Sequence, residues 1–299
     1  MIPQEKNLNN FIAKKSLGQN FLHAPHVANT MIRAANIGPD SIVLEVGPGK
    51  GALTEKILST GATIVAVEKD DRAISFLQEK FSDAVKMGKL KIIHRDILDF
   101  SLENLNEDGL VCGEYILAAN IPYYITGEFL RKFLESSCQP QRMVLMVQKE
   151  VAKRITVNTG NKKGQKESIL SISVKAYGKP SYITTVPARY FRPVPNVDSA
   201  VLLIETISNK FFNNDSTEYN KIKNSGSEEN FFSVVKAGFA HKRKVLIKNI
   251  ENKDLTMGLD RETLQKIWQE RGFSVKIRAE ELTLDDWRAI VATTTHNRQ

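Results

Sequence analysis

Asn120 stands at the end of a short apolar run and is followed by Ile-Pro-Tyr-Tyr, residues 121–124. An asparagine side chain offers one oxygen acceptor, and a proline turn frees a backbone carbonyl as a second. Acceptors around both N–H bonds of adenine's exocyclic amine would favour a pyramidal nitrogen, whose lone pair can attack a methyl donor. Pro122 would stiffen the loop, and the ring of Tyr123 would stack on an unstacked base. The motif therefore predicts methyl transfer to adenine, with a hydrophobic turn as the alternative; for Tyr124 we favour a core position.

A glycine-rich turn follows an apolar run in VLEVGPGKGALT, residues 43–54. Gly47, Gly49 and Gly51 let the backbone turn tightly and approach a ligand, and the next helix would direct free N–H groups at it. Glu68 closes the following apolar run and is placed to accept hydrogen bonds from ribose hydroxyls. Because GPGKGA also satisfies the dinucleotide pattern G-x-G-x-x-A, the turn indicates a nucleoside-containing cofactor without identifying it. A glycine turn beside a surface glutamate is the alternative without a ligand.

The elements that would position these residues follow a strand–helix alternation from residue 41 onward. Short runs rich in Val, Ile and Leu are typical of buried parallel strands, and the segments between them have amphipathic helical spacing. The alternation predicts a doubly wound, mostly parallel α/β sheet, extended by two antiparallel strands joined by a proline-rich turn within residues 181–207. The predicted strands cover residues 41–47, 62–68, 90–96, 115–120 and 142–148, and the predicted helices cover 52–60, 72–81 and 127–137.

Polar or glycine residues close four consecutive predicted strands. Ligands of open α/β sheets bind at the carboxyl ends of the strands, so Gly47, Glu68, Asp96 and Asn120 should line one crevice. Asp96 taken alone could merely cap a helix. Four such strand ends in succession favour a binding site.

The remainder of the chain changes character after residue 208. Residues 209–230 are rich in Asn and Ser and are typical of a linker, whereas residues 231–299 have helical patterns. The chain carries a formal net charge of +8, and residues 231–250 hold five basic residues and no acidic one. A solvated helix face and a contact with RNA phosphates are both compatible with such a run. Lys242 falls on the apolar face of the predicted helix, so either the helix breaks near His241 or this side chain snorkels.

Composition narrows the class of protein. The chain has 299 residues, of which 41% are hydrophobic and 25% charged, as in ordinary globular proteins. It has no long apolar run typical of a membrane span and no apolar signal segment, so we expect a cytoplasmic protein. Cys112 and Cys138 have no C-x-x-C spacing, and we interpret both as free, buried thiols in a reducing compartment. The histidines show no ligand spacing, so we expect no metal.

Five motifs occur in order between about residues 11 and 290, and together they resemble those of one family. The motifs are QNFL (19–22), VLEVGPGKGALT (43–54), NIPYYIT (120–126), FRPVPNVDSAV (191–201) and FAHKRKVL (239–246). In this ordered set the chain resembles the bacterial small-subunit ribosomal RNA adenine N6,N6-dimethyltransferases. The resemblance implies a Rossmann-like class I methyltransferase domain that uses S-adenosyl-L-methionine (SAM) as methyl donor. It also implies two adjacent adenosines near the 3′ end of 16S rRNA as acceptors, and a role in biogenesis of the small subunit.

The resemblance assigns roles to individual residues. Residues 1–25 would fold over the cofactor, whose contacts fall on Asn20, Leu22, Gly47, Glu68, Asp96 and Asn120. A helix-flanking hydrophobic staple is the alternative for the QNFL segment. Phe191 would form a second aromatic contact with the target base, so that Tyr123 and Phe191 clamp an extruded adenine; packing on the sheet is the alternative. Asn120, Pro122, Tyr123 and Phe191 are thus the predicted catalytic residues.

The resemblance also favours RNA contact by the basic segment, through Lys242, Arg243 and Lys244. The predicted organisation is a catalytic domain over residues 1–208, a linker over 209–230 and a helical RNA-binding domain over 231–299. The RNA partner would be 16S rRNA in the small subunit or in an assembly intermediate. We expect a monomer.

Three other functions compete with this prediction. A large-subunit rRNA methyltransferase of the erythromycin-resistance type would use the same chemistry, and Ile121 stands where such enzymes often have Ile and small-subunit enzymes more commonly have Leu. A nicotinamide-dependent oxidoreductase would explain the glycine turn but not the Asn-Ile-Pro-Tyr motif or the basic helix. A non-catalytic ribosome-assembly factor would retain both RNA binding and cofactor residues.

Overall fold

The computed structural model divides the chain into two compact units. The first unit holds residues 1–152 and 179–207, and the second holds 153–178 and 208–299. The structure describes residues 12–14, 17–103, 105–157, 166–213, 228–241, 243–250 and 261–293.

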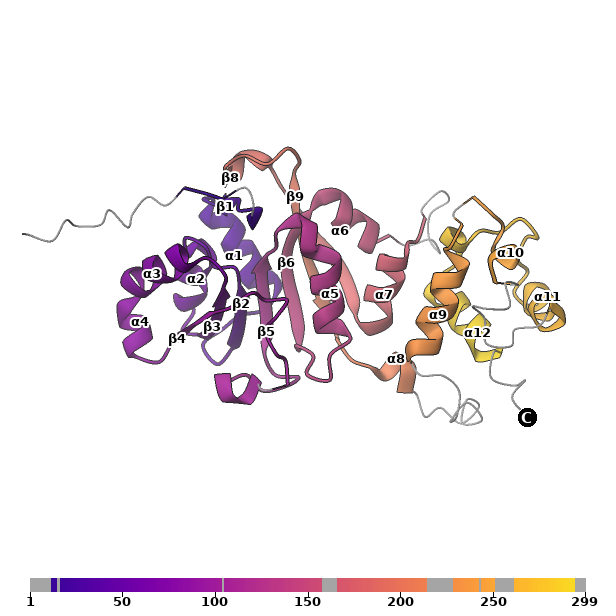
Figure 1. The fold of residues 1–299 in the computed structure, drawn as a ribbon, viewed down its shortest axis with the longest axis horizontal. Coiled ribbons are helices and arrows are strands. Elements are labelled where there is room, and N and C mark those ends of the chain that lie inside the picture. Colours follow the sequence, from indigo (N-terminus) through magenta and orange to yellow (C-terminus); the bar gives the residue numbers. More distant parts are fainter. Residues whose placement is uncertain are drawn as a thin grey trace, which may run out of the picture. The chain divides into compact units, whose positions relative to one another are not determined.

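A mostly parallel sheet organises the first unit (Figure 1). Among the described residues, seven strands form this sheet in the order β4-β3-β2-β5-β6-β9-β7. The strands β2 to β6 run parallel to one another, whereas β9 is antiparallel to both β6 and β7. The predicted fold class and the antiparallel addition are confirmed. The strands are β2 (Ile42–Val46), β3 (Thr63–Glu68), β4 (Leu90–His94), β5 (Ile116–Asn120), β6 (Arg142–Gln148), β7 (Lys179–Val186) and β9 (Ser199–Glu205).

The central strands are buried on both faces, which is why they read as continuous apolar runs. On one face, α1 (Pro25–Ala34) and α2 (Ala52–Leu58) join alternate strand residues in a hydrophobic core. Val43, Ile64 and Ala118 belong to this core, as the two-residue period of a strand requires. The remaining helical elements that begin in this unit are α3 (Asp71–Lys80), α4 (Ser82–Lys86), α5 (Thr126–Leu134), α6 (Lys149–Ile155) and the 3-10 turns η3 (Leu105–Asp108), η4 (Tyr123–Ile125) and η5 (Ala188–Tyr190).

A small second sheet joins distant parts of the first unit. Strand β1 (Phe21–Leu22) pairs antiparallel with β8 (Phe191–Arg192), with Leu22 opposite Phe191 (Figure 1). This pairing fixes the N-terminal segment beside the proline-rich turn between β7 and β9. Neither strand was predicted, because two residues are too few to show a period.

The second unit is helical. Its aromatic side chains form edge and stacked contacts, for example between Tyr177 and Phe232 and between Phe239 and Trp287. Gly238 is required by this packing, since a Cβ there would lie 2.3 Å from the Trp287 ring. The described elements are α7 (Ile169–Tyr177), α8 (Lys210–Asn213), α9 (Glu228–Gly238), α10 (Leu246–Ile250), α11 (Arg261–Glu270), η7 (Ala279–Glu281) and α12 (Leu284–Thr293).

The unit boundaries differ from the predicted division in two respects. Residues 153–178, including α7, belong to the second unit, although the sequence division put them in the catalytic domain. The short helix α8 lies inside the predicted linker, of which residues 214–227 are outside the described residues. The helix predicted for the basic segment, residues 231–250, is interrupted, because α9 ends at Gly238 and α10 begins at Leu246. A break near His241 was one of the two alternatives given for the position of Lys242, and the structure supports the break.

The prediction of two free, buried thiols is wrong. Cys112 and Cys138 form a disulfide, with their Cα atoms 4.6 Å apart, and Cys112 is exposed. The two residues lie in separate loops, one before β5 and one after α5, and meet only because these elements pack together. A separation of 26 residues carries no sequence signal for such a pairing.

Membrane-spanning helices and metal-binding clusters are both absent from the described part of the chain. No helix there has the length and apolar character needed to cross a membrane. Within the same residues, no group of three His, Cys, Asp or Glu side chains is arranged to hold a metal ion.

Candidate active site

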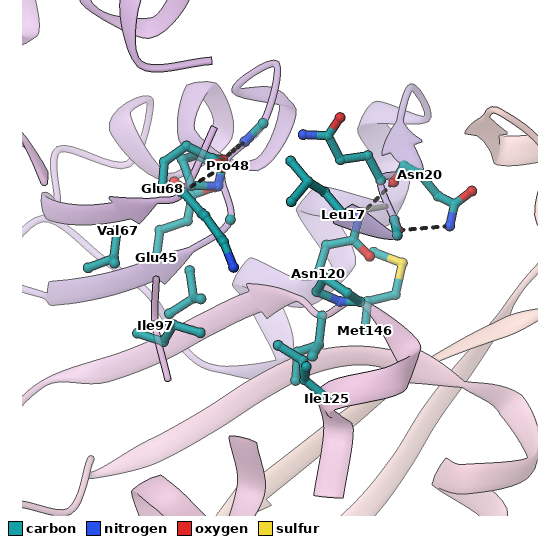
Figure 2. Close-up of a pocket in the computed structure, with 18 of the residues that line it drawn as sticks. Leu17, Asn20, Glu45, Pro48, Val67, Glu68, Ile97, Asn120, Ile125 and Met146 are labelled. Carbon is teal, nitrogen blue, oxygen red and sulfur yellow. Dashed lines mark hydrogen bonds between the residues drawn. The ribbon is translucent and has the colours of Figure 1, made fainter. Parts of the chain in front are cut away.

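A cavity of about 310 Å³ opens at the carboxyl ends of the parallel strands. The N-terminal segment, the glycine turn, the end of β3, the loop after β4 and the turn after β5 all contribute to its wall. Figure 2 shows Glu45 and Glu68 on one side of the cavity and Asn20 and Asn120 on the other. The predicted residues that line it are Asn20, Leu22, Gly47, Glu68, Asp96, Asn120, Pro122 and Tyr123.

The glycine turn has the backbone that its sequence requires. Gly47, Gly49 and Gly51 have φ angles of 66°, 55° and 72°, a region that other residues rarely adopt. A Cβ on Gly49 would lie 2.9 Å from the Phe21 ring, so the turn also accommodates the N-terminal segment. A Cβ on Gly47 would meet nothing within 4 Å. The turn therefore presents bare backbone to open space in the cavity.

Glu68 is held rigidly at the end of β3. One carboxylate oxygen accepts a hydrogen bond from the Gly49 N–H at 3.0 Å, and the other accepts from the N–H groups of Lys69 and Asp70, each at 2.9 Å. Burial raises the pKa of Glu68, although these three hydrogen bonds oppose the rise. The carboxylate keeps lone pairs for a further donor, because each oxygen can accept more than one hydrogen bond.

Glu45 is a site residue that the sequence reasoning missed. Its side chain lines the cavity from within β2, is 1% exposed, and has one oxygen with no hydrogen-bond partner. Burial is the main cause that raises its pKa to about 8. An acidic residue inside an otherwise apolar strand was the available signal. A buried carboxyl with an unsatisfied oxygen, on a residue of the cavity wall, fits a positively charged or hydrogen-bond-donating ligand group.

Asp96 lies in the loop after β4, opposite a lysine. Lys69 Nζ donates to one of its oxygens at 2.5 Å, and the Leu98 N–H donates to the other at 3.0 Å. Burial alone would raise the pKa of Asp96, but these two hydrogen bonds and the nearby charges of Lys69 and Lys132 together lower it. Asp96 is therefore an ionised acceptor at the edge of the cavity.

The orientation of the Asn120 side chain follows from its one hydrogen bond. Its Nδ2 donates to the backbone carbonyl of Asn20 at 3.0 Å. Because a carbonyl can only accept, the amide nitrogen must face Asn20, and the amide oxygen takes the other direction. Among the described residues, none donates to that oxygen. The site thus holds a fixed acceptor with unused capacity.

The turn after Asn120 supplies a ring and a second acceptor. The Tyr123 ring is half-buried, and its hydroxyl shares a hydrogen bond of 2.7 Å with Ser199 at the start of β9. The Pro122 carbonyl accepts from the Ile125 N–H, whereas no described residue donates to the Ile121 carbonyl. The expected core position of Tyr124 is wrong: its side chain is 68% exposed, because the 3-10 turn directs it outward at the cavity rim.

Two groups of predicted site residues lie elsewhere. Phe191 is 1% exposed and packs in the hydrophobic core with α1 and α2, which favours the sheet-packing alternative over a clamp on the base. Arg243 and Lys244 are exposed and belong to the second unit. Lys242 is outside the described residues.

A family model and curated relatives match nearly the whole chain. The family described as ribosomal RNA adenine dimethylase matches residues 10–293. A protein of Dehalococcoides mccartyi named ribosomal RNA small subunit methyltransferase A is 37% identical over 278 residues, which cover 93% of this chain and 87% of that protein.

Solved structures share the fold. A dimethyladenosine transferase from Plasmodium falciparum superposes with a TM-score of 0.67 at 22% identity, covering 90% of this chain and 95% of that one. The 23S rRNA methyltransferase ErmE superposes with the same TM-score of 0.67 at 20% identity, covering 92% and 99%. At these identities the structural likeness concerns the fold.

Proposed function

The chain belongs to the ribosomal RNA adenine dimethylase family, and from this premise we propose that it methylates two adjacent adenosines near the 3′ end of 16S rRNA. Each adenosine would receive two methyl groups on N6, with SAM as donor. The acceptor would be the small ribosomal subunit or one of its assembly intermediates, and the protein would act in the cytoplasm as a monomer.

The cavity residues fit SAM by their chemistry. Gly47 leaves room for a ligand against the backbone, and Glu68 retains acceptor capacity for ribose hydroxyls. Asp96 is an ionised acceptor suited to an adenine amino group. The unpartnered oxygen of Glu45 suits the ammonium group of the donor's methionine part. When bound, SAM would supply an electrophilic methyl group on a sulfonium centre.

The orientation of Asn120 is the observation that carries the proposal. Its amide oxygen and the Ile121 carbonyl would accept hydrogen bonds from the two N–H bonds of the target amine. This arrangement localises the nitrogen lone pair, and it requires no general base before transfer because the amine is neutral. Tyr123 would stack on the extruded adenine, a contact worth roughly 1–3 kcal/mol. We do not assign Phe191 to the base, since its ring is buried in the core.

The second unit would supply phosphate contacts. Arg243 and Lys244 are exposed between α9 and α10, in a segment that has basic residues and no acidic ones. Such residues hold RNA through its backbone and contribute to affinity more than to choice of sequence. Lys242 would act with them.

A large-subunit rRNA adenine methyltransferase remains the second candidate, because ErmE shares the fold. The relative at 37% identity carries a small-subunit name, which supports the first candidate. The test is to incubate the protein and SAM with small subunits and, separately, large subunits that lack the modification, and to map methylated adenines by mass spectrometry. We expect two neighbouring N6,N6-dimethyladenosines near the 3′ end of 16S rRNA. Methylation confined to 23S rRNA would establish the second candidate, and an absence of methylation in both would favour an assembly factor.

A further inference from the structure

The side chain of Gln19 bridges two parts of the first unit. Its Nε2 donates to Asp70 Oδ2 at 2.8 Å, and its Oε1 accepts from the Lys14 N–H at 2.8 Å. Both ends of the amide are therefore engaged, with only one orientation that satisfies them. We call this arrangement the Gln19 bridge.

Asp70 is a firm anchor for the bridge. It caps α3 by accepting from the Arg72 N–H, and the Arg72 guanidinium donates to both of its oxygens, at 2.9 and 2.6 Å. Its side chain is 0% exposed, and the hydrogen bonds from Arg72 are the main cause that lowers its pKa. An ionised carboxylate cannot donate, so Gln19 must turn its nitrogen toward Asp70. Arg72 also donates to the Ile12 carbonyl at 3.0 Å, which ties the same segment to α3 a second time.

The bridge lies next to the residue that orients Asn120. The backbone carbonyl of Asn20 is the acceptor for Asn120 Nδ2, and Asn20 Nδ2 in turn donates to the Gly18 carbonyl at 3.3 Å. Gly18 has a φ of 61°, and a Cβ there would lie 3.0 Å from the Tyr124 ring. The turn from Gly18 to Asn20 is thus packed against the target-base motif on one side and held by Gln19 on the other.

We propose that Gln19 is a positioning residue for methyl transfer: through Asp70 it holds the Asn20 carbonyl where that carbonyl keeps the Asn120 oxygen directed at the target amine. Without this acceptor the Asn120 amide can rotate by half a turn and present N–H groups, which cannot accept from an amine. The N-terminal segment would then be part of the catalytic geometry as well as a cover for the cofactor. This inference rests on the proposed function.

A polarity swap tests the bridge. Gln19→Glu places two carboxylates together, and we expect kcat at saturating SAM and RNA to fall about tenfold or more, in line with coupling between residues in contact. In the double variant Gln19→Glu, Asp70→Asn, the donor and acceptor are exchanged and the net charge is that of the wild type. We expect its kcat to recover to within about threefold of wild type, above the kcat of Gln19→Glu alone and of Asp70→Asn alone. Gln78→Glu, the same change at an exposed position on α3, is the matched control and should leave kcat unchanged.

A second measurement does not depend on activity. Amide hydrogen exchange in the protein without ligand should be faster at Phe21 and Leu22 in Gln19→Glu than in wild type, and should return toward wild type in the double variant. Wild-type kcat in Gln19→Glu, or a double variant no better than its worse parent in both measurements, would overturn the proposal. If the wild-type protein methylates no adenine, the proposed function fails, whereas the exchange measurement still decides whether the bridge holds the segment.

Discussion

At the scale of single residues, the site depends on which atoms are already engaged. Asn120 has its nitrogen occupied by Asn20 and its oxygen available, so the side chain is set as an acceptor before any substrate arrives. Glu68 and Asp96 are likewise fixed by backbone N–H groups. A site of this kind stabilises developing charge without reorganising at the moment of reaction.

Replacement of Asn120 by Ala should remove the oxygen acceptor while leaving RNA contacts in place. We expect kcat to fall by about 10²–10³, as when one aligned polar group is lost from other active sites, with RNA affinity within about twofold of wild type. Radiolabelled methyl transfer and RNA binding by filter retention measure the two quantities. Asn106→Ala, at an exposed position in η3, is the control. Unchanged turnover in Asn120→Ala would contradict the catalytic role.

The raised pKa of the buried Glu45 carboxyl predicts that the free energy of unfolding depends on pH. Its carboxyl is neutral in the folded protein below about pH 8 but ionises near pH 4.5 when unfolded, so the folded state binds more protons between these values. This contribution to stability is complete below pH 4.5 and is lost as the pH rises through 8. Urea unfolding at pH 5.5 to 8.5 should show wild type losing up to about 1.4 kcal/mol per pH unit relative to Glu45→Gln. Parallel pH profiles for the two proteins would show that Glu45 is ionised when folded.

At the scale of elements, the strands and helices of the sheet could be predicted because their periods are long enough to read. The runs that became β2 to β6 begin and end within two residues of the predicted ranges. The β1–β8 pair could not be predicted, since it joins Leu22 to Phe191 across the whole unit and involves two residues on each side. The same limit explains why the strand-end residues could be proposed as cofactor contacts from the pattern, whereas Asn20 and Leu22 were proposed only from the resemblance.

Two substitutions at Phe191 distinguish a role in core packing from a role in contacting the target base. Its burial between β1 and the core predicts that Phe191→Leu, which keeps apolar bulk, retains methylation within about threefold of wild type. Phe191→Ala should lower the free energy of unfolding by about 3–5 kcal/mol, because it leaves a cavity. Urea unfolding and kcat for the two variants test this pair of outcomes. A stable Phe191→Leu protein with a large loss of kcat would restore the clamp on the base.

At the scale of the whole molecule, the chain divides chemistry and charge between two units. The cavity is built within the first unit, and the basic segment with Arg243 and Lys244 belongs to the second. The change of composition after residue 208 indicated a second part of the chain, whereas no pattern in the sequence indicated that residues 153–178 belong to the same compact unit as residues 208–299. It gave no indication of the Cys112–Cys138 disulfide either, since that contact depends on tertiary packing.

Neutralising Arg243 and Lys244 should affect RNA and cofactor differently. In Arg243→Gln, Lys244→Gln we expect weaker RNA binding and a salt-dependence slope smaller by about 1.4–1.8, with SAM affinity unchanged. RNA dissociation constants across a potassium chloride series and calorimetry with SAM measure these effects. Lys86→Gln, Arg131→Gln removes two exposed charges from the first unit as a charge-matched control. An identical slope in both double variants would exclude Arg243 and Lys244 from the RNA interface.

Through the hydrogen bond between Tyr123 and Ser199, strand β9 holds an aromatic ring of the cavity as well as completing the sheet. Ser199 begins β9, so this hydrogen bond ties the Tyr123 ring at the cavity to a strand that pairs antiparallel with β6 and β7. A ring whose rotation is already restricted loses little conformational entropy when a planar base stacks on it. Grafting the glycine turn and residues 120–124 into another α/β scaffold would therefore transfer the functional groups. The Tyr123 ring would stay fixed only if β9, with Ser199, were transferred as well.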